Sequence, residues 1–87
     1  MPKVVVTHPV SDVAQWASKH SERAAAFAPF ASNLVEYFPG DGSNVVAVTL
    51  DVHDMAGLQA ALGSPAVAAL KKSHGVLDPM MVFVEKS

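Results

Sequence analysis

The sequence has no cysteine, so it can form neither a disulfide bond nor a zinc site with thiolate ligands. In small domains those devices often supplement a hydrophobic core that is too small to be stable alone. Charged residues are also scarce, at 16% of the 87 residues, whereas 51% are hydrophobic. A small domain with so few charges has more apolar surface than its own core can bury. We therefore expect a homodimer that covers the surplus.

Basic clusters and long apolar runs are absent as well. Six Lys and Arg residues stand against eight Asp and Glu residues, which gives a net charge of −2 and no basic patch for a phosphate backbone. No apolar run approaches the roughly 20 residues that cross a bilayer, and the N-terminal stretch is far shorter than a signal-peptide core. We expect a single cytoplasmic domain over residues 1–87, with neither nucleic acid nor membrane as a partner.

The most informative stretch that is present covers residues 44–54, Asn-Val-Val-Ala-Val-Thr-Leu-Asp-Val-His-Asp, which we interpret as the central strand of a sheet. One side of its alternation carries Val46, Val48, Leu50 and Val52, and the other carries Val45, Ala47 and Thr49. A strand that is apolar on both sides is usually buried on both. Helices of the same chain can cover one face of this sheet, so we expect a second copy to cover the other.

Turn and cap residues divide the rest of the chain. Residues 3–8 and 34–38 are predicted strands, rich in β-branched or aromatic side chains and followed by proline. One helix is expected from Ser11 or Asp12 to Pro29, and a second covers 55–62, restarts at Ser64-Pro65 and stops at Gly75. Residues 80–85 form the last predicted strand. The order β-α-β-β-α-β predicts a ferredoxin-like α+β fold, with a four-stranded antiparallel sheet and both helices on one face.

Two segments resemble a known superfamily. Residues 6–16, Val-Thr-His-Pro-Val-Ser-Asp-Val-Ala-Gln-Trp, resemble the start of many small dimeric α/β barrel proteins, whose first strand ends in His-x-Val-x-Asp and is followed by a Trp. Residues 62–76 look like the second helix of these proteins, with a Ser-Pro restart and a closing Gly-Val. Together with the order of elements, the resemblance covers nearly the whole chain.

This resemblance implies that two sheets pack face to face into a barrel and that each subunit keeps an apolar pocket between its own sheet and helices. The superfamily includes cofactor-independent monooxygenases of antibiotic biosynthesis, polyketide cyclases, dehalogenase-like enzymes and heme-handling enzymes. We would expect from it an Arg late in the first helix and a Gly before the second strand. This chain has Phe27 and Ala31 at those places.

The expected topology gathers one set of polar and aromatic residues. The first two strands run in parallel directions with the third between them, so both end where the first helix begins and the second finishes. This arrangement brings His8, Trp16, Tyr37 and His74 to one end of the sheet and His53 to the other. A strand of seven residues spans roughly 23 Å, so His8 and His53 cannot share a ligand.

His8 and Tyr37 are the candidate catalytic residues. His8 points to the same side as Val4 and Val6, where it can act as a general base near neutral pH, or it is a strand-end histidine satisfied by backbone or water. The Tyr37 hydroxyl can orient a substrate carbonyl or phenolate, although a half-exposed tyrosine beside a hairpin is common. Either Tyr37 or its neighbour Phe38 faces the helices.

Trp16, His20, Phe27 and His74 complete the candidate ligand pocket. Trp16 either packs the first helix onto the sheet or forms a stacking wall for a planar ligand. His20 lies one turn after Trp16, where it either faces the pocket or is a satisfied helix histidine. His74 precedes the terminating glycine, and its interaction with the helix C-terminus accounts for it. No three side chains converge as metal ligands, and we predict neither a metal nor a cofactor.

Two classes of function are compatible with this sequence. The first is a cofactor-independent cyclase or monooxygenase acting on an aromatic or polyketide-like compound, with His8 as the base and Tyr37 or His20 orienting an oxygen atom. The second is a non-catalytic protein that binds a small hydrophobic ligand or serves only as an oligomerisation module. Its support is the Ala-rich run at residues 24–28, where an enzyme would place charge.

Overall fold

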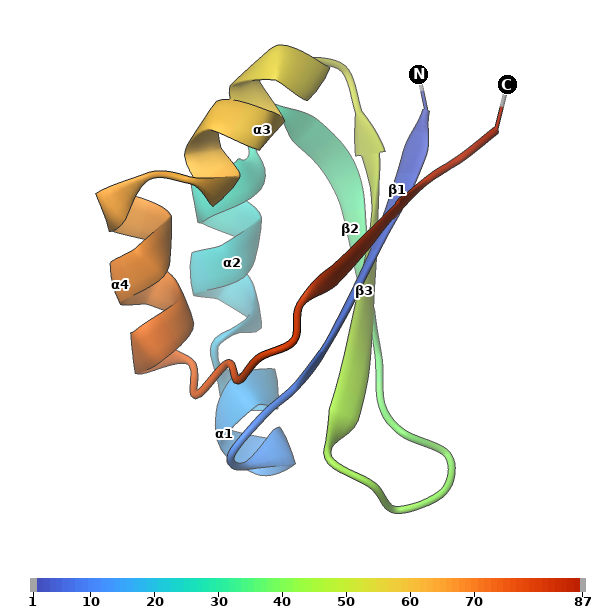
Figure 1. Ribbon diagram of the computed structural model, residues 1–87, viewed down its shortest axis with the longest axis vertical. Coiled ribbons are helices and arrows are strands. Elements are labelled where there is room, and N and C mark those ends of the chain that lie inside the picture. The colour runs from blue at the N-terminus through green and yellow to red at the C-terminus, as the bar shows by residue number, and fades with distance from the viewer. Residues whose placement is uncertain (1, 87) are drawn as a thin grey trace.

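The structure, a computed structural model, describes residues 2–86 (Figure 1). Within them the elements follow in the order β1 (Lys3–Pro9), α1 (Val13–Ser18), α2 (His20–Phe27), β2 (Ala31–Tyr37), β3 (Val45–Val52), α3 (Met55–Leu62), α4 (Pro65–Ser73) and β4 (Met81–Val84). The helices lie on one side of the sheet (Figure 1). The predicted ferredoxin-like α+β fold is confirmed. No helix in this part of the chain is long and apolar enough to cross a membrane.

The sheet has the order β2-β3-β1-β4, and each neighbouring pair of strands is antiparallel. β3 therefore lies between β1 and β2, which run in parallel directions, as predicted. The register pairs His8 with Val46 and Val4 with Leu50. β1 and β2 end at the edge of the molecule where α1 begins and α4 finishes (Figure 1).

The helices cover one face of the sheet, which we call the inner face. Along β3 every second residue is buried, and these side chains point to the helices. The buried core consists of Val4, Val10, Trp16, Ala31, Val46, Val48, Leu50, Val52 and Leu58. Burial of each large apolar side chain contributes about 1.5–3 kcal/mol, so this core holds the helices on the sheet.

The opposite face of the sheet, the outer face, is apolar and is covered by no element within residues 2–86. The register assigns to it Val5, Thr7, Val35, Tyr37, Val45, Ala47, Thr49, Met81 and Phe83, with the ion pair of Lys3 and Asp51 at one end. Met81 and Phe83 on the edge strand are 51% and 48% exposed. β3 is thus apolar on both sides, while this chain buries only one of them.

The residues predicted to begin and end the helices do so in the structure. The side chains of Asp12, Asp54 and Ser64 each accept a backbone N–H three residues later and so begin α1, α3 and α4. Pro65 occupies the first turn of α4. After α4 the chain reverses at Gly75, whose φ of 72° lies in the left-handed region that favours glycine.

The first helical segment differs from the prediction, because it divides at Lys19 into α1 and α2. The Lys19 N–H donates to the Trp16 carbonyl at 3.1 Å, one residue closer along the chain than in an α-helix. The same carbonyl accepts a hydrogen bond from Nη2 of Arg23 at 2.6 Å. The periodicity of apolar residues does not reveal this break, since a side chain from the next helix takes part in it.

β2 also differs from the prediction, because it begins at Ala31 rather than Leu34. The pairing register shifts between Ser32 and Val35, which marks a bulge, and Asn33 within it has φ of 55°. The Asn33 side chain donates to the Asp51 carboxylate at 3.1 Å. A bulge interrupts the alternation by which a strand is identified, so the start of β2 was not apparent from the sequence.

Candidate functional site

A cavity of about 60 Å³ lies between the inner face of the sheet and helices α2, α3 and α4. Its apolar walls come from Val6, Phe27, Leu34, Val48, Leu50, Leu58, Leu62, Val67, Leu70, Val76 and Met80, and its polar ones from His8, Arg23, Lys71 and His74. A pocket in this position is what the resemblance to α/β barrel proteins implied.

The polar residues of the cavity are concentrated at one end. His8 is the residue before the last in β1, while Lys71 and His74 lie in the last turn of α4 and at its C-cap. Arg23 lies one turn before Phe27 in α2, so this helix runs from the polar end towards the apolar end. Leu50 pairs with Val4 at the far end of the sheet. The cavity is therefore amphipathic along its length.

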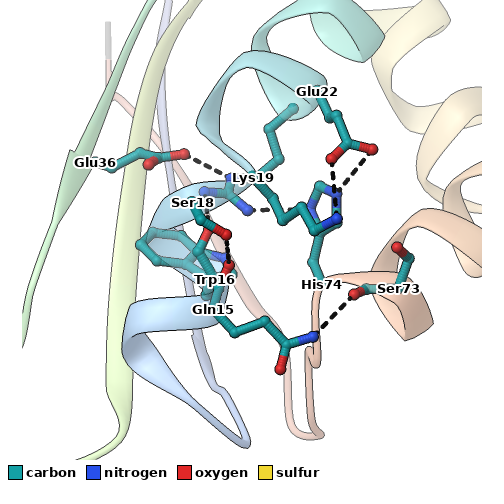
Figure 2. Close-up of polar contacts among 9 residues, drawn as sticks. Gln15, Trp16, Ser18, Lys19, Glu22, Glu36, Ser73 and His74 are labelled. Carbon is teal, nitrogen blue, oxygen red and sulfur yellow. Dashed lines mark hydrogen bonds and ion pairs between the residues drawn. The ribbon is translucent and has the colours of Figure 1, made fainter.

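Arg23 is the centre of the polar end and is only 5% exposed. Its Nε donates to Glu36 at 2.5 Å, Nη1 to Nδ1 of His74 at 3.0 Å and Nη2 to the Trp16 carbonyl at 2.6 Å. The guanidinium also lies 4.1 Å above the centre of the Trp16 indole, a cation–π contact. Figure 2 labels three of these partners, Glu36, Trp16 and His74, which come from β2, α1 and the C-cap of α4.

Glu36 supplies the charge that balances Arg23. It lies on the inner face of β2, where its side chain is 7% exposed, and its second oxygen is 3.1 Å from Nδ1 of His20. A buried guanidinium without a counter-ion would be strongly unfavourable, whereas a hydrogen-bonded pair of this kind can be retained in the interior. At the break between α1 and α2, the Trp16 carbonyl accepts from both the Lys19 N–H and Nη2 of Arg23, so Arg23 is also held from its own side of the fold.

His74 is a buried, neutral histidine at 1% exposure. Because the guanidinium of Arg23 only donates, Nδ1 of His74 must accept, and the ring proton is therefore on Nε2. Burial and the nearby Arg23 charge lower the pKa of His74, in agreement with a neutral ring. Nε2 has no hydrogen-bond partner within residues 2–86, and the carboxylate of Glu22 lies 4.0 Å from it (Figure 2).

His8 has the opposite tautomer and lines the cavity at 4% exposure. Its Nδ1 lies 3.2 Å from the Pro9 carbonyl, which can only accept, so Nδ1 carries the proton and Nε2 keeps its lone pair. Burial lowers the pKa of His8, and the charges of Arg23 and Lys71 lower it further. The Trp16 ring meets the imidazole edge-on at 6.0 Å between centres. At neutral pH His8 is thus an uncharged base.

The structure places three of the six predicted pocket residues at the cavity and a fourth, Trp16, behind it. His8, Phe27 and His74 line the cavity. Trp16 is completely buried behind its polar end, between the rings of His8 and Phe38, with centre distances of 6.0 and 6.3 Å. Trp16 therefore packs the helix against the sheet and is not a wall of the cavity.

Tyr37 and His20 lie apart from the cavity. Tyr37 is 49% exposed on the outer face, where its hydroxyl accepts a hydrogen bond from Thr49 at 3.5 Å, so Phe38 is the one of the two that meets the buried Trp16. The His20 side chain is 51% exposed, and it reaches only the far side of Glu36. Neither side chain is within reach of a ligand held beside His8.

The Arg23–Glu36 pair is the part of the site that sequence reasoning missed. Charged residues are usually exposed, so a single Arg beside an Ala-rich run was not assigned to the buried face. One signal was available, because Arg23 follows Trp16 by two helical turns and precedes Phe27 by one, and these three residues share a face of an ideal helix. Within residues 2–86 no group of three or more His, Asp or Glu side chains is arranged to hold a metal ion.

Comparison with known proteins supports the fold. No family model and no curated protein sequence matches the chain. Among solved structures, SnoaB, a cofactor-independent oxygenase from Streptomyces nogalater, is 18% identical with a TM-score of 0.72, covering 99% of this chain and 93% of that one. An antibiotic biosynthesis monooxygenase is 12% identical with a TM-score of 0.68, and the match covers 100% of this chain and 98% of that one. Rv0793 from Mycobacterium tuberculosis is 16% identical with a TM-score of 0.58, and the match covers 100% of this chain and 95% of that one. At these identities the likeness shows the fold, which is the ferredoxin-like fold expected from the sequence.

Proposed function

We propose that this protein is a homodimeric oxygenase that works without a cofactor on an electron-rich aromatic or polyketide-like compound. The observation that carries the proposal is His8, a buried histidine at the cavity whose Nδ1 is committed to the Pro9 carbonyl and whose Nε2 is free to accept a proton. The similarity in fold to SnoaB, a cofactor-independent oxygenase, supports the same chemistry.

The first step is removal of a proton from the ligand. Nε2 of His8 takes the proton of a phenol or enol hydroxyl, and the ligand becomes an electron-rich phenolate or enolate. The lowered pKa keeps His8 neutral before this step, so the base is ready at pH 7. The edge of Trp16 holds the imidazole in place. The same proton transfer would begin a cyclisation, so the nature of the ligand decides between the two reactions.

The oxygenation that follows balances without an added reductant. The ring carbon conjugated with the oxyanion, which carries one hydrogen, gives its electrons to O₂ and becomes a carbonyl, and the carbon that bears the oxyanion becomes the second carbonyl. One oxygen atom enters the product, and the other leaves as water with the hydrogen of that ring carbon and the proton that His8 took from the hydroxyl. His8 becomes neutral again when it gives this proton to the departing oxygen. The substrate supplies all four electrons, which is why the proposed reaction needs neither flavin nor metal.

We also propose that the outer face is the dimer interface, covered by a second copy of the chain. All four described strands contribute apolar side chains to it, and the large ones on its two edge strands, Phe83 and Met81 on β4 and Tyr37 on β2, are about half exposed. Exposed apolar patches of this extent mark association sites. We assign Tyr37 to this interface and not to the chemical step.

A second candidate, a non-catalytic carrier of a small hydrophobic ligand, is favoured by one observation. Apart from His8, Arg23, Lys71 and His74, every residue that lines the cavity is apolar. Such a wall binds apolar compounds whether or not a reaction follows.

Oxygen uptake with a panel of anthrones and naphthols separates the two candidates. We expect uptake by the purified protein in the presence of EDTA, and a product that has gained one oxygen and lost two hydrogens. His8→Asn should lower kcat/KM by about 10²–10⁴-fold, the usual contribution of a general base. His53→Asn is the matched control, because His53 is exposed and follows the opposite end of the sheet. Equal turnover by the His8 variant would remove His8 from the mechanism, and binding without turnover would favour the carrier.

A further inference from the structure

The charged residues that line the cavity are all of one sign. Arg23 and Lys71 contribute to its wall, together with two histidines, and no Asp or Glu does. Arg23 and His74 are joined by a hydrogen bond of 3.0 Å, and Lys71 lies one turn before His74 in α4. The two cations therefore border the same end of the cavity.

The charges around this end leave one cation in excess. Glu36 neutralises Arg23 through a hydrogen-bonded pair. Lys19 and Glu22, the next charges on the α2 side, neutralise each other at 3.4 Å. Lys71 has no ion-pair partner within residues 2–86. A single negative charge on a ligand would complete the balance.

Arg23 also has N–H groups that the hydrogen bonds described above do not use. A guanidinium carries five N–H groups, and in the described part of the chain three of them are used by Glu36, His74 and Trp16. The side chain is 6% exposed, so bulk water does not reach the remaining two freely. Charged donors that are buried without acceptors are unfavourable, and a ligand oxygen at the cavity wall would satisfy them.

We propose that the cavity selects a small apolar monocarboxylate, whose carboxylate lies between Arg23 and Lys71 and whose aryl or alkyl body extends towards Phe27, Leu58 and Leu62. The apolar end of the cavity receives the body by burial of its surface, and the polar end receives the charge. Nε2 of His8 is left to face a different part of the ligand, because its lone pair repels a carboxylate. The inference shares one premise with the proposed function, namely that the ligand binds in this cavity, and it does not depend on the chemistry assigned to His8.

The test compares cinnamate with cinnamamide, two planar molecules of nearly equal size that differ in one negative charge. Both are titrated into ¹⁵N-labelled protein at pH 7.5, and the amide shifts report both the Kd and the location. We expect cinnamate to bind at least roughly tenfold more tightly, the usual effect of a charge-assisted contact, with shifts centred on α4 and the end of β1.

The matched variants are Lys71→Met and Lys72→Met. Both remove one positive charge from the same turn of α4, but only Lys71 lines the cavity. We expect Lys71→Met to remove most of the preference for cinnamate over cinnamamide, and Lys72→Met to leave it within about twofold, since a distant exposed charge is screened. The cationic analogue cinnamylamine should cause no shifts at the cavity.

Three results would overturn the proposal: no cinnamate shifts at the cavity, equal affinity for cinnamate and cinnamamide, or equal effects of the two lysine variants. Because binding is measured without turnover, these results are separate from the oxygenase assay. Equal affinities would reject the carboxylate and leave His8 chemistry on a neutral phenol intact. Loss of oxygen uptake in every assay, with cinnamate selectivity retained, would reject the oxygenase and leave the anion site intact.

Discussion

Nη1 of Arg23 lies 3.0 Å from Nδ1 of His74, although the two residues are 51 positions apart in the sequence. This contact joins α2 to the end of α4. Both residues line the cavity, and burial together with the nearby Arg23 charge lowers the pKa of His74. Fold stability and the proposed recognition of a ligand therefore involve the same buried group, Arg23.

Removal of one partner of the buried ion pair should strongly destabilise the protein. Arg23→Met leaves Glu36 as an uncompensated buried carboxylate, and Glu36→Gln leaves the guanidinium without its counter-ion. We expect each to lower the free energy of unfolding by about 3–5 kcal/mol, measured by urea denaturation at a fixed protein concentration. The double variant Arg23→Met/Glu36→Leu should be more stable than either single variant, since no buried charge remains. Additive losses would contradict this account.

Stability should also depend on pH through His8. The folded state lowers the pKa of this group by burial and by the facing cations Arg23 and Lys71, so between its folded and unfolded values the unfolded chain binds more protons. The free energy of unfolding should therefore be constant above about pH 7 and fall as pH drops below about 6.5, the unfolded value. His74 contributes with the same sign.

Urea titrations from pH 8 to 5 measure this effect. His8→Asn should reduce the acid-dependent loss of stability, because one of the two buried imidazoles that resist protonation is gone. His53→Asn, which changes an exposed histidine, should leave the slope unchanged. An unchanged slope in His8→Asn, or greater stability of the wild type at pH 5 than at pH 7, would show that His8 is not held neutral by its surroundings.

Gly42 and Gly75 both have positive φ, so alanine substitutions at the two positions separate the effect of the left-handed backbone conformation on stability from the effect of a steric contact. Gly75 has φ of 72° and Gly42 has φ of 76°, but an added Cβ at Gly75 would meet Oγ of Ser11, whereas Gly42 faces open space. Gly42→Ala should lower the free energy of unfolding by about 1–2 kcal/mol, because alanine is unfavourable in the left-handed conformation. Gly75→Ala should lower it by roughly a further 1 kcal/mol or more, since Ser11 must also move. Equal losses in thermal unfolding would mean that Ser11 adjusts freely.

Much of the fold could be predicted because its signals are local. Asp54, Ser64-Pro65 and Gly75 act through their own backbone and side chains, so the bounds of α3 and α4 follow from a few residues. The orientation of His8 followed from its alternation with Val4, which the register confirms. Each of these inferences needs only the covalent neighbours of the residue.

The polar end of the cavity could not be predicted in the same way, because its contacts join distant segments. Arg23 reaches Glu36 from another element and His74 from the far end of the chain. A charged residue in a helix is expected to face solvent unless its partners are known. Glu36 and His74 are polar as well, so each of them, taken alone, was also expected at the surface. The orientation of Tyr37 and Phe38 could not be predicted either, since the alternation of side chains along a strand does not say which of two adjacent aromatic residues faces the helices.

The apolar outer face makes its own prediction, which concerns assembly. Phe83 lies on this face, opposite Val5 in the register, and is 48% exposed within one chain. Phe83→Glu should convert a dimer at micromolar concentration into a monomer, because a carboxylate in an apolar interface has no partner. Ala68→Glu is the control, since Ala68 is exposed on α4, on the opposite side of the fold. Native mass spectrometry of freshly purified protein gives the subunit count of all three samples. A wild-type monomer would mean that nothing covers the outer side of β3, and a dimer that survives Phe83→Glu would place the interface elsewhere.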